Sequence, residues 1–456
     1  YGKVGSYEME NKNVLVLGAA ITGIPTAIEL HNMGYDVIIN DYKPLSELDE
    51  SIRELEGLSI EIITGNHPLD LAYTCDFIVI SPGVPTDIPL VEEARKLGKE
   101  VISEIELGYR MTKTPIIAIT GTNGKTTTTA LLGEIMEASG RKTFVTGNIG
   151  SPMIAEVKNA SPEDVFVLEA SSFQLETTID FKPAVSAILN ITPDHLNRHK
   201  TLENYISAKS KIFSNQSKED YTILNWDNPE TRKLSGLAKS KVLFFSRKEI
   251  LPEGAYVEDE YLTLSLNGKK VRVIDIKDIF IPGKHNLENA LAAALIAYCM
   301  DVDENIIKKI LQDFRGVEHR IEYVCEIDGV IYYNDSKGTN PDSSIQALIT
   351  MTRPTVLIAG GMDKGTDFDE FVSYFDGKVK ALVLFGETAA KIDAAARQAG
   401  FYNIYQVSDL EEAVIKSKEL ASSGDCVLLS PACASWDMFK SYEQRGRLFK
   451  SIVRGL

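Results

Sequence analysis

The segment with the clearest chemistry is glycine-rich: Thr120-Gly-Thr-Asn-Gly-Lys-Thr-Thr127, directly after the apolar residues 116–119. Glycine at 121 and 124 lets backbone N–H groups turn toward phosphate oxygens, and a helix starting after the glycines adds positive potential there. Lys125 is expected to reach the terminal phosphates, and the Thr126 hydroxyl to meet Mg²⁺. The pattern is GxxGK[ST], since Ile119 stands where the full motif has its first glycine. The strand–loop–helix context favours phosphate binding over the alternative, a tight turn with a chance Lys-Thr pair.

Three residues after this loop could hold a metal ion. Glu169 ends an apolar strand, His195 follows a second strand, and Lys209 lies on a helix expected over residues 202–213. The carboxyl ends of parallel strands face one crevice, so Glu169 and His195 are expected to converge near the loop. Each residue alone is more often an ordinary surface or turn residue. Together they favour a Mg²⁺ site, in which one histidine among oxygen ligands is tolerable.

A weaker signal lies in the first block, where Gly18-Ala-Ala-Ile-Thr-Gly23 follows an apolar strand. It has the outer glycines of GxGxxG but alanine in the middle. Asp41, at the end of the next strand, stands where a ribose-binding acid would lie. A dinucleotide site, a site for another nucleotide with a diphosphate, and a tight turn without a ligand all remain open.

Small, hydroxyl and cationic residues also follow apolar strands in the third block. The motifs are Asn334-Asp-Ser-Lys-Gly-Thr-Asn340, Gly360-Gly-Met-Asp-Lys364 and Ser430-Pro-Ala-Cys-Ala-Ser-Trp-Asp437. Such groups suit a small carboxylated molecule, although glycine-rich turns are common in inert loops. No histidine lies near Cys433 in sequence, so this thiol is expected to be packed in the core.

The elements that must position these residues alternate between strand and helix, which predicts an α/β fold with parallel, doubly wound sheets. We expect three domains: a Rossmann-like domain over residues 1–112, a central P-loop ATPase-like parallel-sheet domain over 113–316, and a Rossmann-like domain over 317–456. Within the central domain, Asn267-Gly268 predicts a hairpin turn between strands in 256–273. Asp328-Gly329 predicts a second strand pair.

Composition narrows the classes of function. The 456 residues are 44% hydrophobic and 25% charged, with a formal net charge of −17, so a globular protein without the bulk basic footprint of nucleic-acid binding is expected. The five cysteines are scattered without CxxC spacing, which favours reduced thiols in a cytoplasmic protein and no zinc site. Residues 1–12 are polar, so no signal peptide is expected there. No apolar run reaches the ~20 residues of a membrane span.

The motif at 120–127 is similar to the ATP loop of the Mur ligases of bacterial cell-wall synthesis, and the resemblance covers all three blocks. The motifs at 334–340 and 430–437 resemble those of the members that add D-glutamate. The resemblance implies an ATP-dependent amide ligase. ATP would phosphorylate the terminal carboxylate of UDP-MurNAc-L-alanine, the amine of D-glutamate would attack the acyl phosphate, and a tetrahedral intermediate would collapse to amide, ADP and phosphate.

The resemblance also implies roles for single residues. Those implied to bind ATP are Gly121, Thr122, Asn123, Gly124, Lys125, Thr126, Thr127, His285, Asn286, Asn289, Arg320 and Asp335. Those implied to bind the UDP substrate are Thr22, Asp41, Ser81, Gly83, Asn148, Ser171 and Gln174. Those implied to bind D-glutamate are Lys337, Thr339, Lys364, Ser435 and Tyr442. Thr126, Glu169, His195 and Lys209, the last as a carbamate, would hold two Mg²⁺ ions, and Lys125, Glu169, His195 and Lys209 would be catalytic.

Two other functions compete with this interpretation. One is an NAD-dependent oxidoreductase built on the first block, which would bind nicotinamide and turn over no ATP. The other is a non-catalytic nucleotide switch, which would bind ATP without forming an amide. For the ligase, only small-molecule partners are expected, with no nucleic acid and no membrane.

Overall fold

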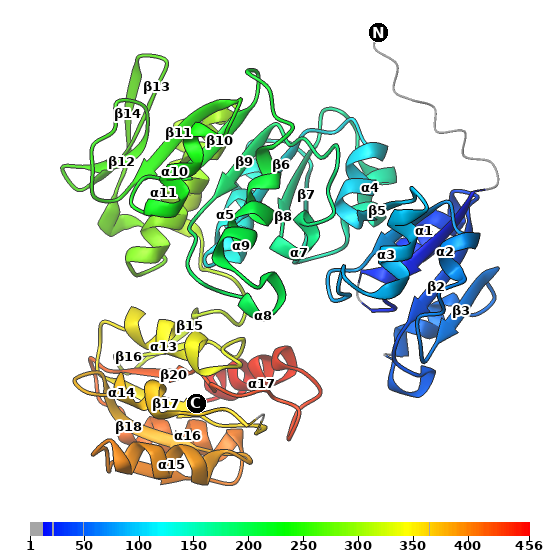
Figure 1. Ribbon diagram of the computed structural model, residues 1–456. Helices are drawn as coiled ribbons and strands as arrows, with labels where there is room; N and C mark the ends of the chain where they lie inside the picture. Colours follow the sequence, from blue (N-terminus) through cyan, green and yellow to red (C-terminus); the bar gives the residue numbers. More distant parts are fainter. Residues whose placement is uncertain (1–11, 21, 49, 364) are drawn as a thin grey trace. The chain divides into compact units, whose positions relative to one another are not determined.

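A computed structural model describes residues 12–20, 22–48, 50–363 and 365–456. The expectations for residues 1–11 and for Lys364 lie outside the described residues. Three β-sheets flanked by helices confirm the predicted α/β fold (Figure 1). Contacts group the chain into two compact units. Unit 1 extends to Ile279 and adds Leu287–Gln312, and unit 2 comprises Phe280–Asn286 and Asp313–Leu456.

The first sheet of unit 1 has five parallel strands in the order β3-β2-β1-β4-β5, the Rossmann-like order predicted for this part of the chain. Its central strand buries four of its five residues, as expected for a parallel strand covered on both faces. The strands are β1 (Asn13–Leu17), β2 (Asp36–Asp41), β3 (Ile60–Thr64), β4 (Phe77–Ile80) and β5 (Glu100–Ser103). The α-helices are α1 (Gly23–Asn32), α2 (Leu71–Thr74), α3 (Pro89–Lys96) and α4 (Glu104–Met111).

Two buried carboxylates on α4 join this first domain to the central domain of unit 1. Glu106 accepts the backbone N–H groups of residues 179–181 at 2.9–3.0 Å and the Arg110 Nε–H at 2.7 Å. Glu104 Oε1 accepts the Ile154 N–H at 2.6 Å, and burial raises the pKa of Glu104 to about 7. The sequence analysis did not single out either residue.

Glu106→Ala is expected to lower the free energy of unfolding by about 3–5 kcal/mol, because three backbone N–H groups stay buried without their acceptor and Arg110 loses its buried partner. Glu100→Ala is the matched control, since Glu100 also pairs with Arg110 but is 46% exposed. Its expected loss is below ~1 kcal/mol. Urea denaturation followed by circular dichroism measures both, and equal losses would contradict the role assigned to Glu106.

The second sheet of unit 1 has nine strands in the order β14-β13-β12-β11-β10-β9-β6-β8-β7. The strands from β7 to β12 pair in parallel, and β13 and β14 add antiparallel. The strands are β6 (Ile116–Thr120), β7 (Thr143–Gly147), β8 (Val165–Glu169), β9 (Val185–Ile188), β10 (Tyr221–Asn225), β11 (Lys241–Ser246), β12 (Gly254–Glu258), β13 (Tyr261–Leu266) and β14 (Lys269–Asp275). The hairpin predicted at Asn267-Gly268 is confirmed. Both turn residues have positive φ, 52° and 77°, as a type I′ turn requires.

Helices cover this sheet. One of them, α11, has a fully buried segment over residues 290–297. A helix that is apolar all round belongs inside a protein, which fits its sequence ALAAALIA. The α-helices of this region are α5 (Lys125–Ala138), α6 (Met153–Glu156), α7 (Ser172–Leu175), α8 (Leu196–His199), α9 (Leu202–Ser210), α10 (Pro229–Lys233), α11 (Lys284–Cys299) and α12 (Glu304–Asp313).

Unit 2 contains a six-stranded sheet in the order β15-β16-β20-β17-β18-β19, parallel except for the β15–β16 hairpin. The strand pair predicted at Asp328-Gly329 is this hairpin. The strands are β15 (Glu322–Ile327), β16 (Val330–Asn334), β17 (Thr355–Ala359), β18 (Val379–Leu384), β19 (Ile404–Gln406) and β20 (Cys426–Leu429). The α-helices are α13 (Pro341–Thr350), α14 (Asp369–Ser373), α15 (Ala389–Gln398), α16 (Leu410–Leu420) and α17 (Tyr442–Arg454).

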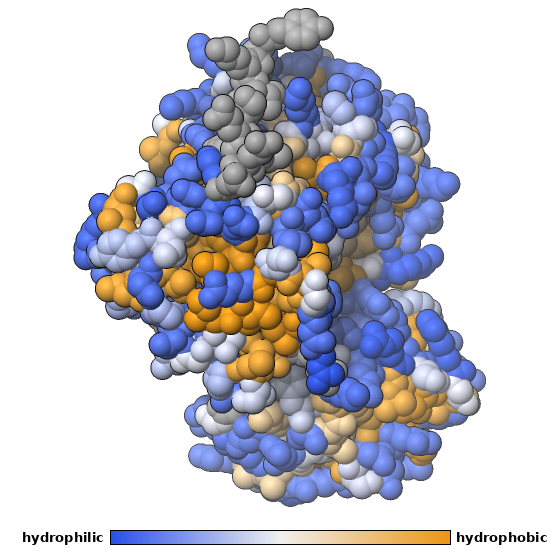
Figure 2. All heavy atoms as spheres, turned by 90° about the vertical axis from the view of Figure 1, so that its right-hand side faces the viewer, coloured by the Kyte–Doolittle hydropathy of each residue, from blue (hydrophilic) through white to orange (hydrophobic). Residues whose placement is uncertain are grey.

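Hydrophilic residues cover most of the face shown in Figure 2, and an apolar area interrupts them. Exposed apolar side chains of the first domain include Leu45, Ile62 and Leu69, so its apolar residues are not confined to the core. In the described part of the chain, no helix combines the length and the apolar composition that a membrane crossing requires.

Candidate active site

The predicted phosphate-binding loop connects β6 to α5 in unit 1. All five residues of β6 are buried, and α5 begins directly after Gly124, whose φ of +83° favours glycine. Lys125 folds back over the loop, and its Nζ donates to the carbonyl oxygens of Gly121 and Thr122 at 2.9 Å each. Thr126 is buried in the first turn of α5. The loop therefore combines glycines that let its backbone turn with the N-terminus of a helix, the two features that a phosphate site requires.

Side chains from distant segments hold this loop in shape. Asn190, two residues after the end of β9, accepts the Asn123 N–H at 2.8 Å and donates its Nδ2 to the Asn123 carbonyl at 3.1 Å. The Thr122 hydroxyl lies 3.2 Å from the Tyr205 hydroxyl on α9. Burial raises the pKa of Tyr205 to about 12, so the phenol keeps its proton. The sequence analysis missed Asn190 and Tyr205, although both stand in motifs that flank predicted site residues.

Lys209 on α9 lies against the loop. Its Nζ donates to the Gly121 carbonyl at 2.9 Å and lies 3.3 Å from the Thr120 hydroxyl. Burial, followed by the nearby positive charge of Lys125, holds the pKa of Lys209 well below its ordinary value. A lowered pKa makes the neutral, nucleophilic form of an amine easier to reach, so Lys209 is a candidate for nucleophilic attack on a small electrophile.

Glu169 closes β8 with its side chain almost completely buried. Its Oε1 accepts a hydrogen bond from Asn148 Nδ2 at 2.8 Å, which brings together two predicted site residues. Its Oε2 is buried and has no hydrogen-bond partner in the part of the chain that the structure describes. A buried carboxylate oxygen of this kind is costly unless a cation meets it, so its chemistry fits a Mg²⁺ ligand.

His195 is placed differently from the other predicted metal ligands. It lies in the segment between β9 and α8, has a φ of +52°, and exposes half of its side chain. Its ring lies 5.0 Å from the Phe173 ring, and its Nε2 lies 3.5 Å from Asp194 Oδ2. Across residues 12–20, 22–48, 50–363 and 365–456, no three His, Cys, Asp or Glu side chains gather where they could hold a metal ion. A metal site therefore needs other donors, such as the Thr126 hydroxyl and a Lys209 carbamate.

Helix α11 carries three residues that are predicted to contact the nucleotide, and these residues belong to different units. Asn289 belongs to unit 1 and lies against the loop, since a Cβ added to Gly124 would fall 2.3 Å from Asn289 Oδ1. His285 and Asn286 belong to unit 2, where Asn286 Nδ2 donates to the Pro282 carbonyl at 2.7 Å. Desolvation by the surrounding protein and then the charge of Arg320 lower the pKa of His285.

In the first domain, the predicted UDP-site residues surround the turn between β1 and α1. A Cβ added to Gly23 would fall 1.7 Å from the Gly18 carbonyl oxygen, so this turn requires glycine. The Ser81 hydroxyl donates to the same carbonyl at 3.2 Å. Asp41 accepts the Ala19 N–H at 2.7 Å with its Oδ2, so the carboxylate shapes the turn. Thr22 directly precedes α1, and Gly83 is exposed in the segment after β4.

Ser171 and Gln174 form a capping box at the start of α7, in which each side chain accepts a backbone N–H of the other residue. Near this helix, a cavity of about 610 Å³ lies between Pro85–Asp87 of the first domain and residues Arg198–Lys200, Asn204 and Ser207–Ala208 of the central domain. Unit 1 therefore has room for a ligand that contacts both of its domains.

Unit 2 brings together most residues predicted to bind D-glutamate. Lys337 Nζ lies 5.9 Å from the centre of the Tyr442 ring, and the Thr339 N–H donates to the Lys337 carbonyl at 2.9 Å. Ser435 is buried beside Ala434, whose carbonyl accepts the Met362 N–H at 3.0 Å. Cys433 is buried, as predicted.

Two further predicted ATP contacts of unit 2, Arg320 and Asp335, lie close together. Asp335 Oδ1 accepts the N–H of Ile321, which directly follows Arg320, at 3.2 Å. Asp335 Oδ2 accepts the Ser430 hydroxyl at 2.7 Å. Burial raises the pKa of Asp335 to about 7, although the nearby Arg320 charge opposes this shift.

Three family models match the chain in order. They are "Mur ligase MurD-like, N-terminal domain" over residues 12–103, "Mur ligase middle domain" over 119–297, and "Mur ligase, glutamate ligase domain" over 319–433. The UDP-N-acetylmuramoylalanine--D-glutamate ligase of Thermoanaerobacter pseudethanolicus is 51% identical over 98% of this chain and 99% of that protein. The protein of the same name from Clostridioides difficile is 48% identical over 98% of this chain and all of that protein.

Solved structures show the same fold at lower identity. UDP-N-acetylmuramate-alanine ligase MurC of Thermotoga maritima matches with a TM-score of 0.60 and 22% identity, covering 97% of this chain and 99% of that chain. MurF of Acinetobacter baumannii matches with a TM-score of 0.60 and 16% identity, covering 96% of this chain and 93% of that chain. All three predicted domains thus have counterparts in one family, and the chain belongs to the Mur ligases.

Proposed function

We propose that this chain is an ATP-dependent amide ligase that joins D-glutamate to UDP-N-acetylmuramoyl-L-alanine in peptidoglycan precursor synthesis, releasing ADP and phosphate. The observation that carries the proposal is the glycine loop with Lys125 above it, the buried amine of Lys209 beneath it, and the buried Glu169 on the adjacent strand. Relatives that are 48–51% identical over 98% of the chain bear the name of this ligase.

The reaction has two steps. An oxygen of the alanine carboxylate attacks the γ-phosphorus of ATP, and ADP leaves. The amine of D-glutamate then attacks the carbonyl carbon of the acyl phosphate, and the tetrahedral adduct loses a proton and phosphate to give the amide. One oxygen of the original carboxylate therefore departs in the phosphate.

The residues of the loop contribute positioning and charge, which are the main needs of phosphoryl transfer. Backbone N–H groups of residues 121–127 and the N-terminus of α5 bind the triphosphate. Lys125 Nζ leaves its two carbonyl acceptors and turns to the phosphates, where its charge stabilises the transferring group. Asn190 and Tyr205 keep the loop in shape during this exchange.

Thr126, Glu169, His195 and a carbamate on Lys209 would hold Mg²⁺, for which we propose two ions. The partnerless Oε2 of Glu169 supports this assignment. When bound, Mg²⁺ neutralises charge on the phosphates and on the attacked carboxylate. The carbamate forms when the neutral Lys209 nitrogen attacks the carbon of CO₂ and releases one proton, which converts an amine donor into an anionic oxygen ligand.

The remaining predicted residues divide between the other two substrates. Thr22, Asp41, Ser81 and Gly83 shape or border the turn that would take the UDP group, and Asn148, Ser171 and Gln174 would take the muramoyl part. Lys337, Thr339, Ser435 and Tyr442 would hold D-glutamate, together with Lys364, which lies outside the described residues. The five cysteines are free thiols, which supports a reaction in the cytoplasm.

Phosphate release tests the proposal directly. With ATP, Mg²⁺ and UDP-N-acetylmuramoyl-L-alanine present, release is expected only after D-glutamate is added, with L-glutamate and D-alanine as control amino acids. A coupled phosphate assay measures the rate. Release that does not depend on D-glutamate would reject the assignment, and reduction of a nicotinamide cofactor would favour an oxidoreductase.

A further inference from the structure

Arg320 lies in a strained segment of unit 2. Its neighbours His319 and Ile321 have φ values of +66° and +47°, and neither is glycine. A β-branched residue with positive φ is a true conformational outlier, so the surrounding contacts must impose this backbone. The strained segment carries a residue predicted to contact ATP, and backbone strain of this kind gathers where geometry serves function.

Backbone hydrogen bonds connect this segment to both predicted subsites of unit 2. The Ile321 N–H donates to Asp335 Oδ1 at 3.2 Å, and the His319 carbonyl accepts the Lys337 N–H at 3.0 Å. The Arg320 N–H donates to the Val317 carbonyl at 3.0 Å. The same three residues therefore connect the predicted ATP contacts to the predicted D-glutamate loop.

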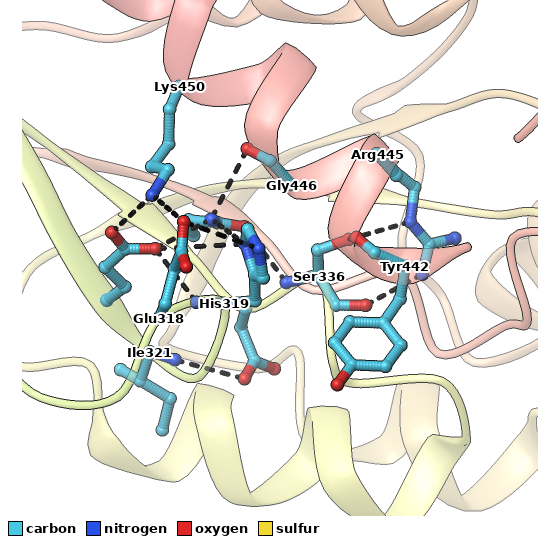
Figure 3. Close-up of polar contacts among 11 residues, drawn as sticks. Glu318, His319, Ile321, Ser336, Tyr442, Arg445, Gly446 and Lys450 are labelled. Atoms are coloured by element: carbon cyan, nitrogen blue, oxygen red, sulfur yellow. Dashed lines mark hydrogen bonds and ion pairs between the residues drawn. The ribbon is translucent and has the colours of Figure 1, made fainter. Parts of the chain in front are cut away.

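The His319 ring is buried, and its contacts hold this segment in place (Figure 3). Its Nδ1 accepts a hydrogen bond from Asn334 Nδ2 at 2.9 Å, which places the ring proton on Nε2. The same Asn334 amide donates to Glu322 Oε2 at 2.9 Å, and Glu322 Oε2 also accepts the His319 N–H at 2.9 Å. The ring also meets the Tyr442 ring edge-on at 6.1 Å between centroids.

Helix α17 provides the surface on which this ring rests. A Cβ added to Gly446 would fall 2.2 Å from His319 Nδ1, so any side chain at 446 would displace the ring. One turn later, Lys450 pairs with Glu318 at 2.6 Å and with Glu322 at 2.9 Å, on both sides of the strained residues. Glycine is unfavourable in the interior of a helix. Its presence at 446 therefore fits a requirement that the His319 ring approach the α17 backbone closely.

We propose that His319 is a positioning residue that, seated on Gly446 and bonded to Asn334, holds Arg320 in place for ATP and holds the Lys337 loop for D-glutamate. This inference rests on the proposed function, because it takes the substrates from there. His319 itself touches neither substrate. Its effect reaches them through Arg320, through the backbone of Lys337 and through the Tyr442 ring.

Two variants at position 319 distinguish a role of His319 in positioning the substrate-binding residues from a role in the stability of the fold alone. His319→Asn keeps an acceptor near the place of Nδ1 and tolerates positive φ, whereas His319→Leu does neither. His319→Leu is expected to raise KM for ATP and KM for D-glutamate by about tenfold or more. KM for UDP-N-acetylmuramoyl-L-alanine is expected to stay constant, because the residues predicted to bind it lie in unit 1. His319→Asn is expected to stay within about threefold of the wild type on all three constants.

Gly446→Ala is a second, independent test of the positioning role of His319. Helix propensity alone predicts that alanine stabilises α17, so any loss of stability in this variant comes from displacement of the His319 ring. If that ring served stability alone, the three KM values would stay unchanged. The proposal instead predicts the same split between the three KM values as for His319→Leu. Ser451→Ala, at an exposed position of the same helix, is the control and should match the wild type.

Binding of a non-hydrolysable ATP analogue, measured by titration calorimetry on the same full-length proteins, keeps this test separate from the proposed function. A wild type without D-glutamate-dependent phosphate release would reject the ligase, yet the analogue would still report whether His319→Leu weakens binding about tenfold relative to His319→Asn. Equal affinities in these two folded variants would overturn the positioning role. So would an equal rise in all three KM values.

Discussion

Lys125→Ala is expected to lower D-glutamate-dependent phosphate release by about 10³-fold while the chain remains folded. The Lys125 ammonium is the cation of the loop, and its acceptors include two backbone carbonyls that it can exchange for phosphate oxygens. Removing it leaves the charge that develops on the transferring phosphoryl group without its closest protein cation. The rate is measured at saturating concentrations of all three substrates.

Lys233→Ala is the control for this variant, since Lys233 is an exposed lysine of the same unit that pairs with the nearby Glu230. It should keep the wild-type rate, and thermal unfolding followed by circular dichroism should give similar Tm values for both variants. A Lys125→Ala protein with at least a tenth of the wild-type rate would remove this lysine from the mechanism.

Lys209→Ala is expected to lower the rate by about 10²-fold or more, because the site would lose the anionic oxygen ligand that we propose forms as a carbamate on this lysine. Part of the activity should return when acetate is added, since a small carboxylate can enter the space that the side chain vacates. Wild-type protein kept free of CO₂ should lose activity and regain it on addition of bicarbonate. Stopped assays with and without acetate measure both effects.

The exposed Lys218 serves as the matched control, and Lys218→Ala should respond to neither acetate nor CO₂. If Lys209→Ala works as fast as the wild type, Lys209 has no part in the reaction. If the wild type is indifferent to CO₂ while Lys209→Ala is inactive, the lysine acts as an amine that holds the Gly121 carbonyl, and the carbamate is wrong.

Features that depend on local backbone geometry could be predicted from the sequence. The glycine loop before α5 and the hairpin turns at Asn267-Gly268 and Asp328-Gly329 each depend on residues that tolerate positive φ. The parallel sheets follow from short apolar runs that alternate with helices. The family resemblance then supplied roles that periodicity and spacing could not.

Contacts between distant segments could not be predicted in the same way. Asn190 and Tyr205 support the loop through side-chain hydrogen bonds that cross 67 and 83 positions of sequence, and no periodic pattern marks such bonds. The buried acceptor Glu106 looks in the sequence like any charged helix residue. His195 was predicted to converge with Glu169, and nothing in the sequence indicated its positive φ, its half-exposed side chain or its pairing with Asp194.

The path of one oxygen atom tests the central claim most directly. UDP-N-acetylmuramoyl-L-alanine carrying ¹⁸O at both oxygens of its terminal carboxylate is incubated with the enzyme, ATP, Mg²⁺ and D-glutamate, and the released phosphate is analysed by mass spectrometry. If ATP bound at the glycine loop phosphorylates this carboxylate, each phosphate carries one labelled oxygen. Unlabelled phosphate, formed alongside the amide product, would contradict the account.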